Sequence, residues 1–379
     1  MTKKPSYRFV GYTEPWEQKK LGEVAEVNPK SVVPDEFKYV DLGAVIGTEM
    51  ISYRNETIST SPSRAQRLAI KGDVFYQTVR PYQKNNYLFK KDDNDYVFST
   101  GYAQLRPSGD GCFLLSYLQT NKFVNVVLDN CTGTSYPAIN SKDLSDIFIS
   151  LPSLPEQTAI GSFFQEIDQL ISLQQRKLEV FKEQKKTYLK LLFPAKGQTK
   201  PALRFAGFEN EWKEVKLGEV VASERKGKAK SEMIGNKSVY LDTIYLNGGE
   251  QTRVDCDCDT SKEDIIILWD GSQAGAVYYG FEGALGSTLK SYKIFGSGSF
   301  YYQQMKASQS LIFERYRTPN IPHVIKSFLD DFYIFTTSLP EQEAIGSFFQ
   351  DLDKAIAKQE EKVNQLKESK QTLLRKMFI

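Results

Sequence analysis

The chain has 379 residues, 40% of them apolar and 13% aromatic, which is enough to form packed cores in two or three domains. Its formal net charge of +2 neither requires nor excludes a nucleic-acid partner, because a binding surface can be locally basic on a nearly neutral chain. The 4 cysteines are too few for a disulfide framework, and no apolar run suits a secretory signal or a membrane span, so the sequence predicts a cytoplasmic protein with no membrane association.

The sequence contains an internal repeat in two registers. A shift of 185 positions aligns residues 154–194 with 339–379, with 21 identities in 41 positions. A shift of 196 positions aligns RFVGYTEPWEQKKLGEV, which starts at Arg8, with RFAGFENEWKEVKLGEV, which starts at Arg204. Each half therefore has an RFxG and KLGEV motif, a variable body, and a helix that begins with LPEQ. A shared frame around diverged bodies is expected of two modules with similar roles and different targets.

The first body is predicted to contain strands around a polar loop. Aromatic and β-branched residues predict strands at 74–79, 87–90 and 96–106, and the loop RPYQKNN follows the first of them. Arginine can read guanine edges, and asparagine or glutamine can read adenine edges, so the loop is a candidate for base contacts. A solvated hairpin loop is the alternative interpretation. The candidate residues are Arg80, Gln83, Lys84, Asn85 and Asn86.

The turn NCTGTSYPAINSKDLSD ends the first body. Its backbone amides are candidates for phosphate contact, with Thr134 and Ser135 as the residues concerned. Asn140 or Ser141 is expected to cap a short helix after the turn. The alternative interpretation is a connector that closes the domain.

A long amphipathic helix follows the turn. After Pro155, which suits a first helical turn, apolar residues recur at alternating spacings of four and three. Only Gln174 and Lys185 interrupt this stripe, and its length of about five heptads predicts a coiled coil rather than a surface helix. The apolar positions are Ile160, Phe164, Ile167, Ile171, Leu178, Phe181, Tyr188 and Leu192.

The second body opens with the basic run SERKGKAK. Its cationic side chains could neutralise DNA phosphates, although such runs are often only solvated surface. The residues are Arg225, Lys226, Lys228 and Lys230.

Farther along the second body, EDIIILWDGSQAG predicts a buried strand followed by a loop. Asp270, Ser272 and Gln273 then occupy the loop where Arg80 stands in the first body. A changed loop on a similar strand would read a different DNA sequence.

The second LPEQ helix has the same apolar stripe, with Gln359 and Lys370 at the two polar places. Antiparallel pairing of the two helices would place Gln174 opposite Lys370. The same register places Lys185 opposite Gln359, so that polar residues meet in the seam. It also relates the two halves by an approximate twofold axis, with one body near each end of the helix pair. Parallel packing, or pairing with a partner chain, is the alternative.

The motifs that most often carry catalysis are missing from the sequence. There is one histidine, His323, and no GxxxxGK[ST] loop, so histidine triads, multi-histidine metal sites and P-loop hydrolysis are disfavoured. PDEFK, at residues 34–38, superficially resembles a nuclease motif, but its acids are crowded together and we interpret it as a turn. Cys256 and Cys258 form a CxC within an acidic stretch, which we interpret as an acidic turn rather than a metal site. The sequence therefore predicts a protein without its own active site or metal.

Taken together, the duplicated W…KLGEV motif, GTSYPAIN…LPSLPEQTAIGSFF and SLPEQEAIGSFF resemble the specificity (S) subunit of type I restriction-modification systems. The resemblance covers essentially the whole chain. In the second half RTPNIPH departs from the glycine-containing turn that is usual in the family, which leaves a phosphate role there without support.

The resemblance implies an α/β (α+β) fold in which two similar target-recognition domains are separated by two long antiparallel coiled-coil helices. Residues 1–152 and 198–337 would be the two domains, and residues 153–197 and 338–379 the two helices. Each domain would read one half-site of a bipartite target in double-stranded DNA, across a spacer whose length the helices set.

The resemblance also implies partner subunits. Two adenine methyltransferase (M) subunits that bind S-adenosylmethionine would pack on the scaffold, and two motor-nuclease (R) subunits that use ATP and magnesium would join them. This chain would supply recognition rather than chemistry, and no cofactor of its own. The rival hypothesis is a coiled-coil scaffold or inhibitor that binds proteins and not DNA.

Overall fold

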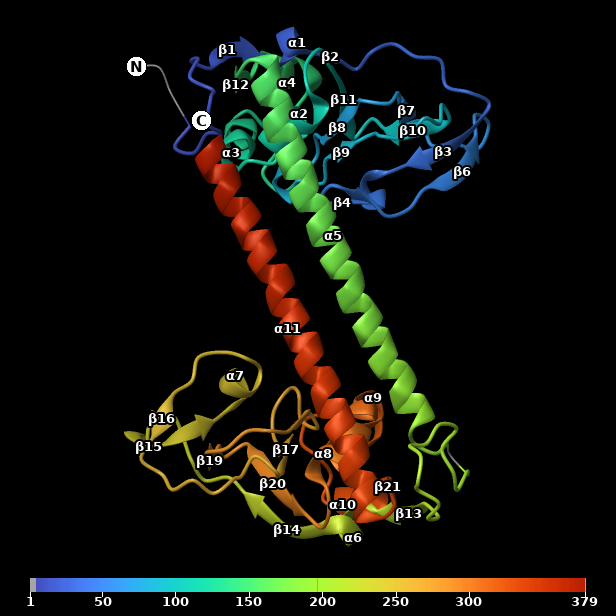
Figure 1. Cartoon of the computed structure of the whole chain (residues 1–379), viewed down its shortest axis with the longest axis vertical. Helices are drawn as coiled ribbons and strands as arrows, with labels where there is room; N and C mark the ends of the chain where they lie inside the picture. The colour runs from blue at the N-terminus through green and yellow to red at the C-terminus, as the bar shows by residue number, and fades with distance from the viewer. Residues whose placement is uncertain (1–4, 196, 379) are drawn as a thin grey trace. The chain divides into compact units, whose positions relative to one another are not determined.

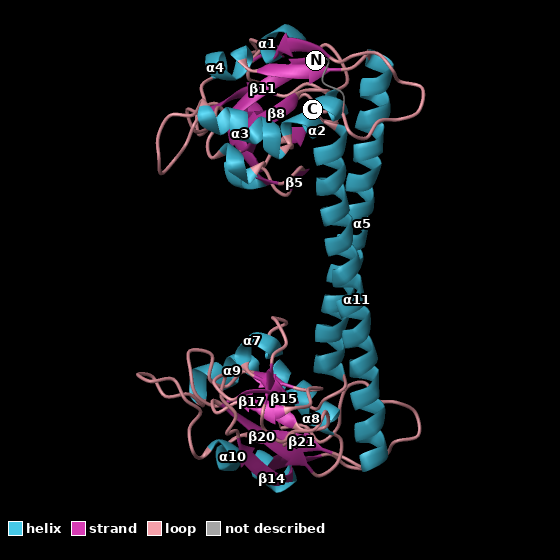
Figure 2. Ribbon diagram, turned by 90° about the vertical axis from the view of Figure 1, so that its left-hand side faces the viewer, coloured by secondary structure: helices cyan, strands magenta, loops and turns pink. Residues whose placement is uncertain are grey.

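The computed structural model describes residues 5–195 and 197–378. They belong to two compact units, the first comprising residues 1–175 with 361–379 and the second residues 176–360. Each unit has an α/β body (Figure 1) and takes in part of the long helices α5 (Leu154–Leu191) and α11 (Leu339–Met377) (Figure 2). None of the helices in the described ranges is long and apolar enough to cross a membrane.

Within its described residues, the first unit contains two four-stranded sheets and two two-stranded ones. Its strands are β1 (Glu17–Lys20), β2 (Ala25–Val27), β3 (Glu36–Val40), β4 (Val45–Ile46), β5 (Glu49–Met50), β6 (Arg54–Thr57), β7 (Ala65–Leu68), β8 (Val74–Gln77), β9 (Tyr87–Leu88), β10 (Tyr96–Ser99), β11 (Tyr102–Pro107) and β12 (Phe148–Leu151). One sheet has the order β2-β11-β8-β9 and the other β6-β3-β10-β7, with β3 and β10 parallel. The sheet β1-β12 joins the RFxG and KLGEV motif to the start of α5, and β4 pairs with β5.

Short helices connect these strands and begin with the side-chain caps that their sequences predict. Asp110, Thr120 and Asn140 each accept a hydrogen bond from the amide three residues later, at 2.8, 3.2 and 2.9 Å. The predicted cap at Asn140 is therefore confirmed. The helices are α1 (Leu21–Val24), η1 (Leu42–Ala44), η2 (Pro81–Gln83), α2 (Gly111–Leu118), α3 (Asn121–Asp129) and α4 (Ser141–Asp146).

The second unit repeats this architecture. Its elements are β13 (Lys213–Lys216), α6 (Leu217–Val220), β14 (Val221–Lys226), β15 (Ile234–Leu241), α7 (Thr243–Leu246), β16 (Arg253–Val254), β17 (Ile265–Leu268), β18 (Val277–Tyr278), β19 (Ala284–Leu285), β20 (Leu289–Ile294), α8 (Gly298–Ala307), α9 (Gln309–Arg315), α10 (Phe328–Asp331) and β21 (Tyr333–Thr336). The sheet β14-β20-β17-β18 repeats β2-β11-β8-β9, and β16-β15-β19 repeats β6-β3-β10, including the parallel pair. At the place of β7, Thr260 forms only an isolated bridge to Gly283.

A repeated tryptophan lies in the core of each unit and contacts the end of a long helix. Trp16 packs against Phe113 and against Phe378, just after α11, with ring centroids 5.9 and 6.2 Å apart. In the second unit Trp212 packs against Phe300 and against Phe193, just after α5, at 5.6 and 5.9 Å. Each body therefore packs against the end of the helix that starts in the other half of the sequence.

The two long helices pack antiparallel within each unit. In the first unit Lys370 forms an ion pair with Asp168, and in the second Lys185 binds Asp353 at 2.6 Å. Each aspartate lies six residues before the glutamine that the register prediction placed opposite that lysine, Gln174 or Gln359. A carboxylate is a stronger partner for an ammonium group than an amide is. The opposition of Gln174 with Lys370 and of Lys185 with Gln359 itself stays a prediction.

Two secondary-structure predictions need correction, one of a strand and one of a turn. The predicted strand 96–106 is two strands, β10 and β11, because the chain turns at Thr100 and Gly101. PDEFK is not a turn: Glu36 to Lys38 begin β3, which pairs with β10 and β6. The alternation of buried Phe37 between Glu36 and half-buried Lys38 is the strand pattern that this reading overlooked.

Candidate nucleic-acid interface

The polar loop after β8 has an unusual backbone. Arg80 and Lys84 both have φ of +55°, in the left-handed region that residues other than glycine seldom adopt. The Arg80 amide donates to the Pro137 carbonyl at 2.8 Å, and the Lys84 amide donates to the Pro81 carbonyl at 3.1 Å. Such strain costs about 1–3 kcal/mol per residue and persists only where surrounding contacts impose it. We therefore treat this loop as a rigid feature of the first unit.

Hydrogen bonds from amide side chains hold the loop at residues 80–86 in place. The Gln77 side-chain amide donates to the Val79 carbonyl at 2.7 Å and to Gln83 Oε1 at 2.8 Å. Asn86 Oδ1 accepts from the Gln77 amide at 2.8 Å, and Asn85 Oδ1 accepts from the Gly47 amide at 2.9 Å. Asn86 is 1% exposed, so its predicted base-reading role is wrong and it supports the loop instead.

The side chains of Arg80 and Lys84 contact different neighbours. The Arg80 guanidinium carbon lies 4.3 Å from the centre of the exposed Tyr136 ring, a cation–π contact. Lys84 Nζ contacts Asn121 Oδ1, and burial, followed by the charge of Lys370, lowers the Lys84 pKa below its usual range. Arg80 is half-buried against Tyr136, Lys84 and Asn85 are half-buried, and Gln83 is exposed.

The structure brings the second predicted contact beside the first. Thr132 and Ala138 exchange two backbone hydrogen bonds of 2.9 and 3.0 Å, and residues 133–137 form the tip between them. Thr134 and Ser135 are exposed in this tip, next to Tyr136. The separately predicted Arg80 and Thr134–Ser135 groups thus lie on one surface, which we call the tip surface of the first unit.

The second unit has the same backbone frame with other side chains. The Gly271 amide donates to the Pro322 carbonyl at 2.9 Å, as the Arg80 amide does to Pro137, and the Val324 amide donates to the Trp269 carbonyl, as Ile139 does to Thr78. Pro322 and Val324 are the residues that the 185-position repeat aligns with Pro137 and Ile139. The place of Arg80 is therefore taken by Gly271.

The predicted residues of the second loop make different contacts. Asp270 forms an ion pair with Lys226 at 3.2 Å. The Ser272 carbonyl accepts a hydrogen bond from Arg317 Nη1 at 3.1 Å. Gln273 is exposed. The structure thus joins Asp270 to the predicted basic run, a contact that the sequence did not indicate.

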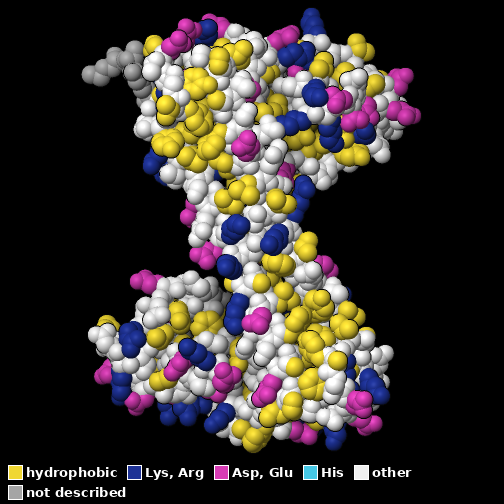
Figure 3. Space-filling model, viewed as in Figure 1, with side chains coloured by type: hydrophobic (Ala, Val, Ile, Leu, Met, Phe, Trp, Pro, Cys, Tyr) yellow, Lys and Arg dark blue, Asp and Glu magenta, His cyan; other side chains and the backbone are white. Residues whose placement is uncertain are grey.

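The basic run itself lies partly in β14. Arg225 Nη1 donates to the Asp259 carbonyl at 3.0 Å, whereas Lys228 and Lys230 are exposed beyond the strand. On the face drawn in Figure 3, Lys and Arg side chains are interspersed with Asp and Glu over both bodies. Lys228 and Lys230 are therefore the residues of this run best placed for phosphate contacts.

The LPEQ motif is a positioning element that sequence reasoning did not recognise. Glu156 is fully buried, and its carboxylate accepts two 2.6 Å hydrogen bonds from Arg8. Arg204 and Glu341 repeat this pair at 2.7 and 2.8 Å. Hydrogen bonding to Glu156 raises the pKa of Arg8 above its usual value. The signal was present in the sequence, since both partners of the pair belong to the repeated motifs.

The next residue of the motif binds the N-cap residue of a short helix in each unit. Gln157 donates to the Pro152 carbonyl at 2.9 Å and accepts from the Asp110 amide at 3.3 Å. Gln342 makes the same two contacts, to the Thr337 carbonyl and the Ser297 amide, at 2.8 and 3.1 Å. Asp110 and Ser297 are the N-caps of α2 and α8. The repeated motif therefore locks each body to a long helix.

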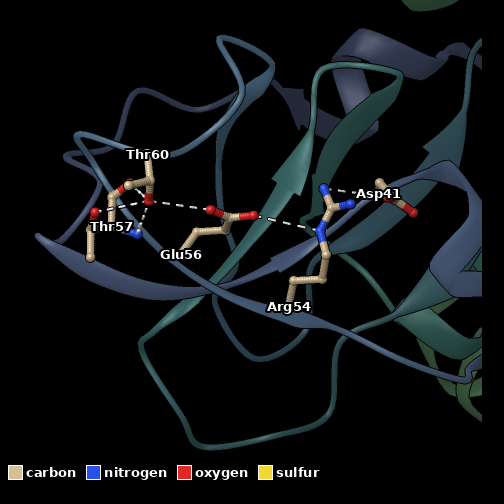
Figure 4. Close-up of polar contacts among 5 residues, drawn as sticks. All are labelled: Asp41, Arg54, Glu56, Thr57 and Thr60. Carbon is tan, nitrogen blue, oxygen red and sulfur yellow. Dashed lines mark hydrogen bonds and ion pairs between the residues drawn. The ribbon is translucent and has the colours of Figure 1, made fainter.

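A polar pocket on β3 and β6 is lined by acidic and other polar side chains. Arg54 lies 3.6 Å from Asp41 and 3.5 Å from Glu56, and Glu56 accepts from Thr60 (Figure 4). Lys38, in the wall of this pocket, forms a 3.0 Å ion pair with Asp95. Among the described residues no three acidic, histidine or cysteine side chains are arranged to hold a metal ion. Cys256 Sγ instead lies 3.3 Å from Met233 Sδ, and Cys258 Sγ lies 3.5 Å from the Thr260 carbonyl.

Two equivalent α/β bodies, each locked to paired long helices and each presenting a different loop on the same frame, define a duplicated recognition scaffold. The family model of the type I restriction modification DNA specificity domain matches residues 13–183 and again residues 209–368. These two matches cover most of the chain, so the chain belongs to this family.

Known proteins agree with this assignment. The type I restriction enzyme MjaVIII specificity subunit of Methanocaldococcus jannaschii is 27% identical over 180 residues, which cover 44% of this chain and 42% of that relative. The crystal structure of a type I restriction-modification S subunit from M. genitalium matches with a TM-score of 0.70 at 17% identity, over 100% of this chain and 99% of that chain. A structure from work on assembly and conformational transition of a type I system gives 0.54 at 21% identity, over 98% and 99%. At these identities the two structures show a shared fold.

Proposed function

We propose that this protein is the sequence-specific DNA recognition subunit of a type I restriction-modification complex, and that each unit reads one half-site of a bipartite target. The observation that carries the proposal is the repeated loop frame. The same backbone hydrogen bonds hold Arg80 in the first unit and Gly271 in the second, so the scaffold is constant and the reading side chains differ. Such a pair of modules suits a target with two unlike halves.

The proposed partners follow from the family. The chain scaffolds two adenine methyltransferase subunits and two motor-nuclease subunits, and it addresses their chemistry without catalysing a reaction. S-adenosylmethionine, ATP and magnesium are bound by those partners in this proposal. The names of the relatives, which are specificity subunits, support this division of labour.

The test is the adenine methylation pattern of host DNA. Single-molecule sequencing is done with the gene present and with it deleted, while the neighbouring methyltransferase gene stays intact. The proposal expects methylation at a bipartite motif that disappears on deletion. Unchanged methylation in cells that express the protein would favour the rival coiled-coil scaffold or inhibitor.

A second test uses the purified complex and duplex DNA. Phosphate contacts release counterions, so binding should weaken steeply as salt rises. Binding is measured on the complex with its methyltransferase subunits. A complex that assembles but shows no salt-dependent DNA binding would contradict the recognition role.

A further inference from the structure

Each unit exposes one large apolar side chain at an equivalent place beside its loop. Tyr136 is 64% exposed in the first unit and Ile321 is 79% exposed in the second. The two residues are 185 positions apart, and each immediately precedes the proline whose carbonyl accepts the loop amide of Arg80 or Gly271. Both bodies thus hold an apolar side chain in the open on the same backbone frame, although their sequences have otherwise diverged.

The backbone around each tip is fixed by several hydrogen bonds. In the first unit Gly133 has φ of +84°, and a Cβ there would lie 3.1 Å from the Tyr136 carbonyl, so the tip is tightly turned. In the second unit Thr318 Oγ1 donates to the Ile321 carbonyl at 2.5 Å, and the Thr318 amide donates to the His323 carbonyl at 3.0 Å. A single exposed apolar residue needs no explanation by itself. Two held at matching positions by different local contacts indicate a shared role.

The surroundings of the two tips favour DNA as the occupant. Tyr136 lies under the cationic Arg80, and the described residues contain no hydrogen bond from the Arg80 side chain. In the second unit Arg317, whose guanidinium bonds to the Ser272 carbonyl, leads into the tip that carries Ile321. Apolar groups beside cations match the major groove, where thymine methyl groups and guanine acceptors lie between phosphates.

We propose that the tips that carry Tyr136 and Ile321 enter the groove at their respective half-sites, where Tyr136 positions Arg80 for base contact and Ile321 itself contacts a base. This inference rests on the proposed function and deepens it. The Tyr136 ring holds the Arg80 guanidinium, whose donors then reach the O6 and N7 acceptors of a guanine. Ile321 has no hydrogen-bonding group and contacts a thymine 5-methyl group. The two units thus read with different chemistry from the same position.

The first experiment compares methylation motifs in cells that carry single variants. Tyr136→Ser should lower the discrimination between the right and the wrong base at one half-site by roughly tenfold or more. Ile321→Ser should do the same at the other half-site. Tyr136→Phe keeps the ring under Arg80 and should restore most of the recognition that Tyr136→Ser loses. Val32→Ser and Phe295→Ser are the matched controls, because the parent side chains are 87% and 64% exposed and belong to neither the loops nor the tips in the sequence. The unaffected half-site serves as an internal control for folding and assembly.

The second experiment uses modified bases in the motif found with the wild-type complex. Replacing the contacted thymine by deoxyuridine should weaken DNA binding by the wild-type complex. It should leave the DNA affinity of the Ile321→Ser complex unchanged. Replacing the guanine by 7-deazaguanine should likewise weaken the wild type more than Arg80→Ala or Tyr136→Ser.

The outcomes separate this inference from the proposed function. If the wild type gives a gene-dependent bipartite motif but Tyr136→Ser and Ile321→Ser leave both half-sites intact, the inference fails and the proposed function stands. A loss at both half-sites from either single variant would also overturn the assignment of one tip to one half-site. A wild type with no gene-dependent motif overturns both.

Discussion

Arg8 and Glu156, which lie 148 residues apart in the chain, form two hydrogen bonds of 2.6 Å between the guanidinium and the carboxylate. Arg8 also donates to the Glu14 carbonyl at 2.6 Å, so one side chain ties the N-terminal motif both to itself and to the start of α5. Arg204, Glu341 and the Asn210 carbonyl repeat the arrangement in the second unit. The two most recognisable repeats of the sequence are therefore the two sides of one contact.

Glu156→Gln should destabilise the first unit strongly. The substitution leaves the Arg8 charge in a site where its partner was fully buried, and losing one partner of a buried ion pair costs about 3–5 kcal/mol. Urea unfolding measures the change, with Glu17→Ala as the control because Glu17 is 72% exposed in its pair with Lys19.

A double variant tests the same explanation from the other side. Arg8→Leu with Glu156→Leu removes both charges together and should regain much of the stability that Glu156→Gln loses. If the single and double variants are equally unstable, the ion pair is not the reason for the loss.

The glycine in the shared AIGSFF motif gives a prediction that distinguishes the two copies. Ordinarily alanine is favoured over glycine in a helix by about 1 kcal/mol. A Cβ at Gly161, however, would lie 2.3 Å from Asp110 Oδ1 and 2.7 Å from the Phe113 amide nitrogen, the two atoms of the α2 cap. Gly161→Ala should therefore destabilise the first unit by about 1–3 kcal/mol.

Gly346→Ala is the matched comparison. Its nearest atoms are the Ser299 and Ser297 hydroxyl oxygens, at 2.2 and 2.9 Å. The Ser299 hydroxyl can rotate away, and the Ser297 cap bond to the Phe300 amide, at 3.4 Å, is longer than the 2.8 Å cap bond of Asp110. The loss of stability should be smaller than for Gly161→Ala when both are measured by thermal unfolding. The opposite order would mean that the α2 cap, not the α8 cap, is the one that adapts.

The sequence was sufficient to predict the frame but not the loops. The 185-position repeat and the heptad stripe predicted two bodies and a helix pair, because both depend on residues that recur at fixed spacing. It could not predict that Asn86 is buried, since an amide in a polar loop looks the same whether it faces solvent or supports Gln77. The separate peptides around Arg80 and Tyr136 became one surface only through the Arg80 to Pro137 backbone bond.

The contacts of the basic run at residues 225–230 could not be predicted from the sequence for the same reason. A row of cations predicts phosphate contact by charge alone, but the contact between Lys226 and Asp270 joins residues that are 44 positions apart. Lysine partners of this kind depend on the sheet order β14-β20-β17, which the sequence of either strand does not reveal.

Arg80→Ala should relax or abolish recognition at the first half-site and spare the second. The substitution removes the guanidinium without disturbing the backbone bond to Pro137, although alanine keeps the strain of a positive φ. Sequencing of methylated adenines reports both half-sites in one experiment. Equal loss of discrimination at both would refute the assignment of this loop to one half-site.

Lys228 should contribute to DNA affinity through charge rather than base contacts. It is exposed beyond β14, so Lys228→Ala should weaken binding of the assembled complex about equally for all sequences. It should also reduce the slope of log affinity against log salt concentration by about 1.

Lys226→Ala should act differently, because it also leaves Asp270 without its 3.2 Å partner beside the second loop, and it should impair recognition at the second half-site. Lys213→Ala, an exposed lysine on β13, is the control and should leave the slope unchanged. Titrations of labelled duplex at several salt concentrations give all three slopes, and a Lys228→Ala slope equal to that of wild type would remove this lysine from the phosphate contacts.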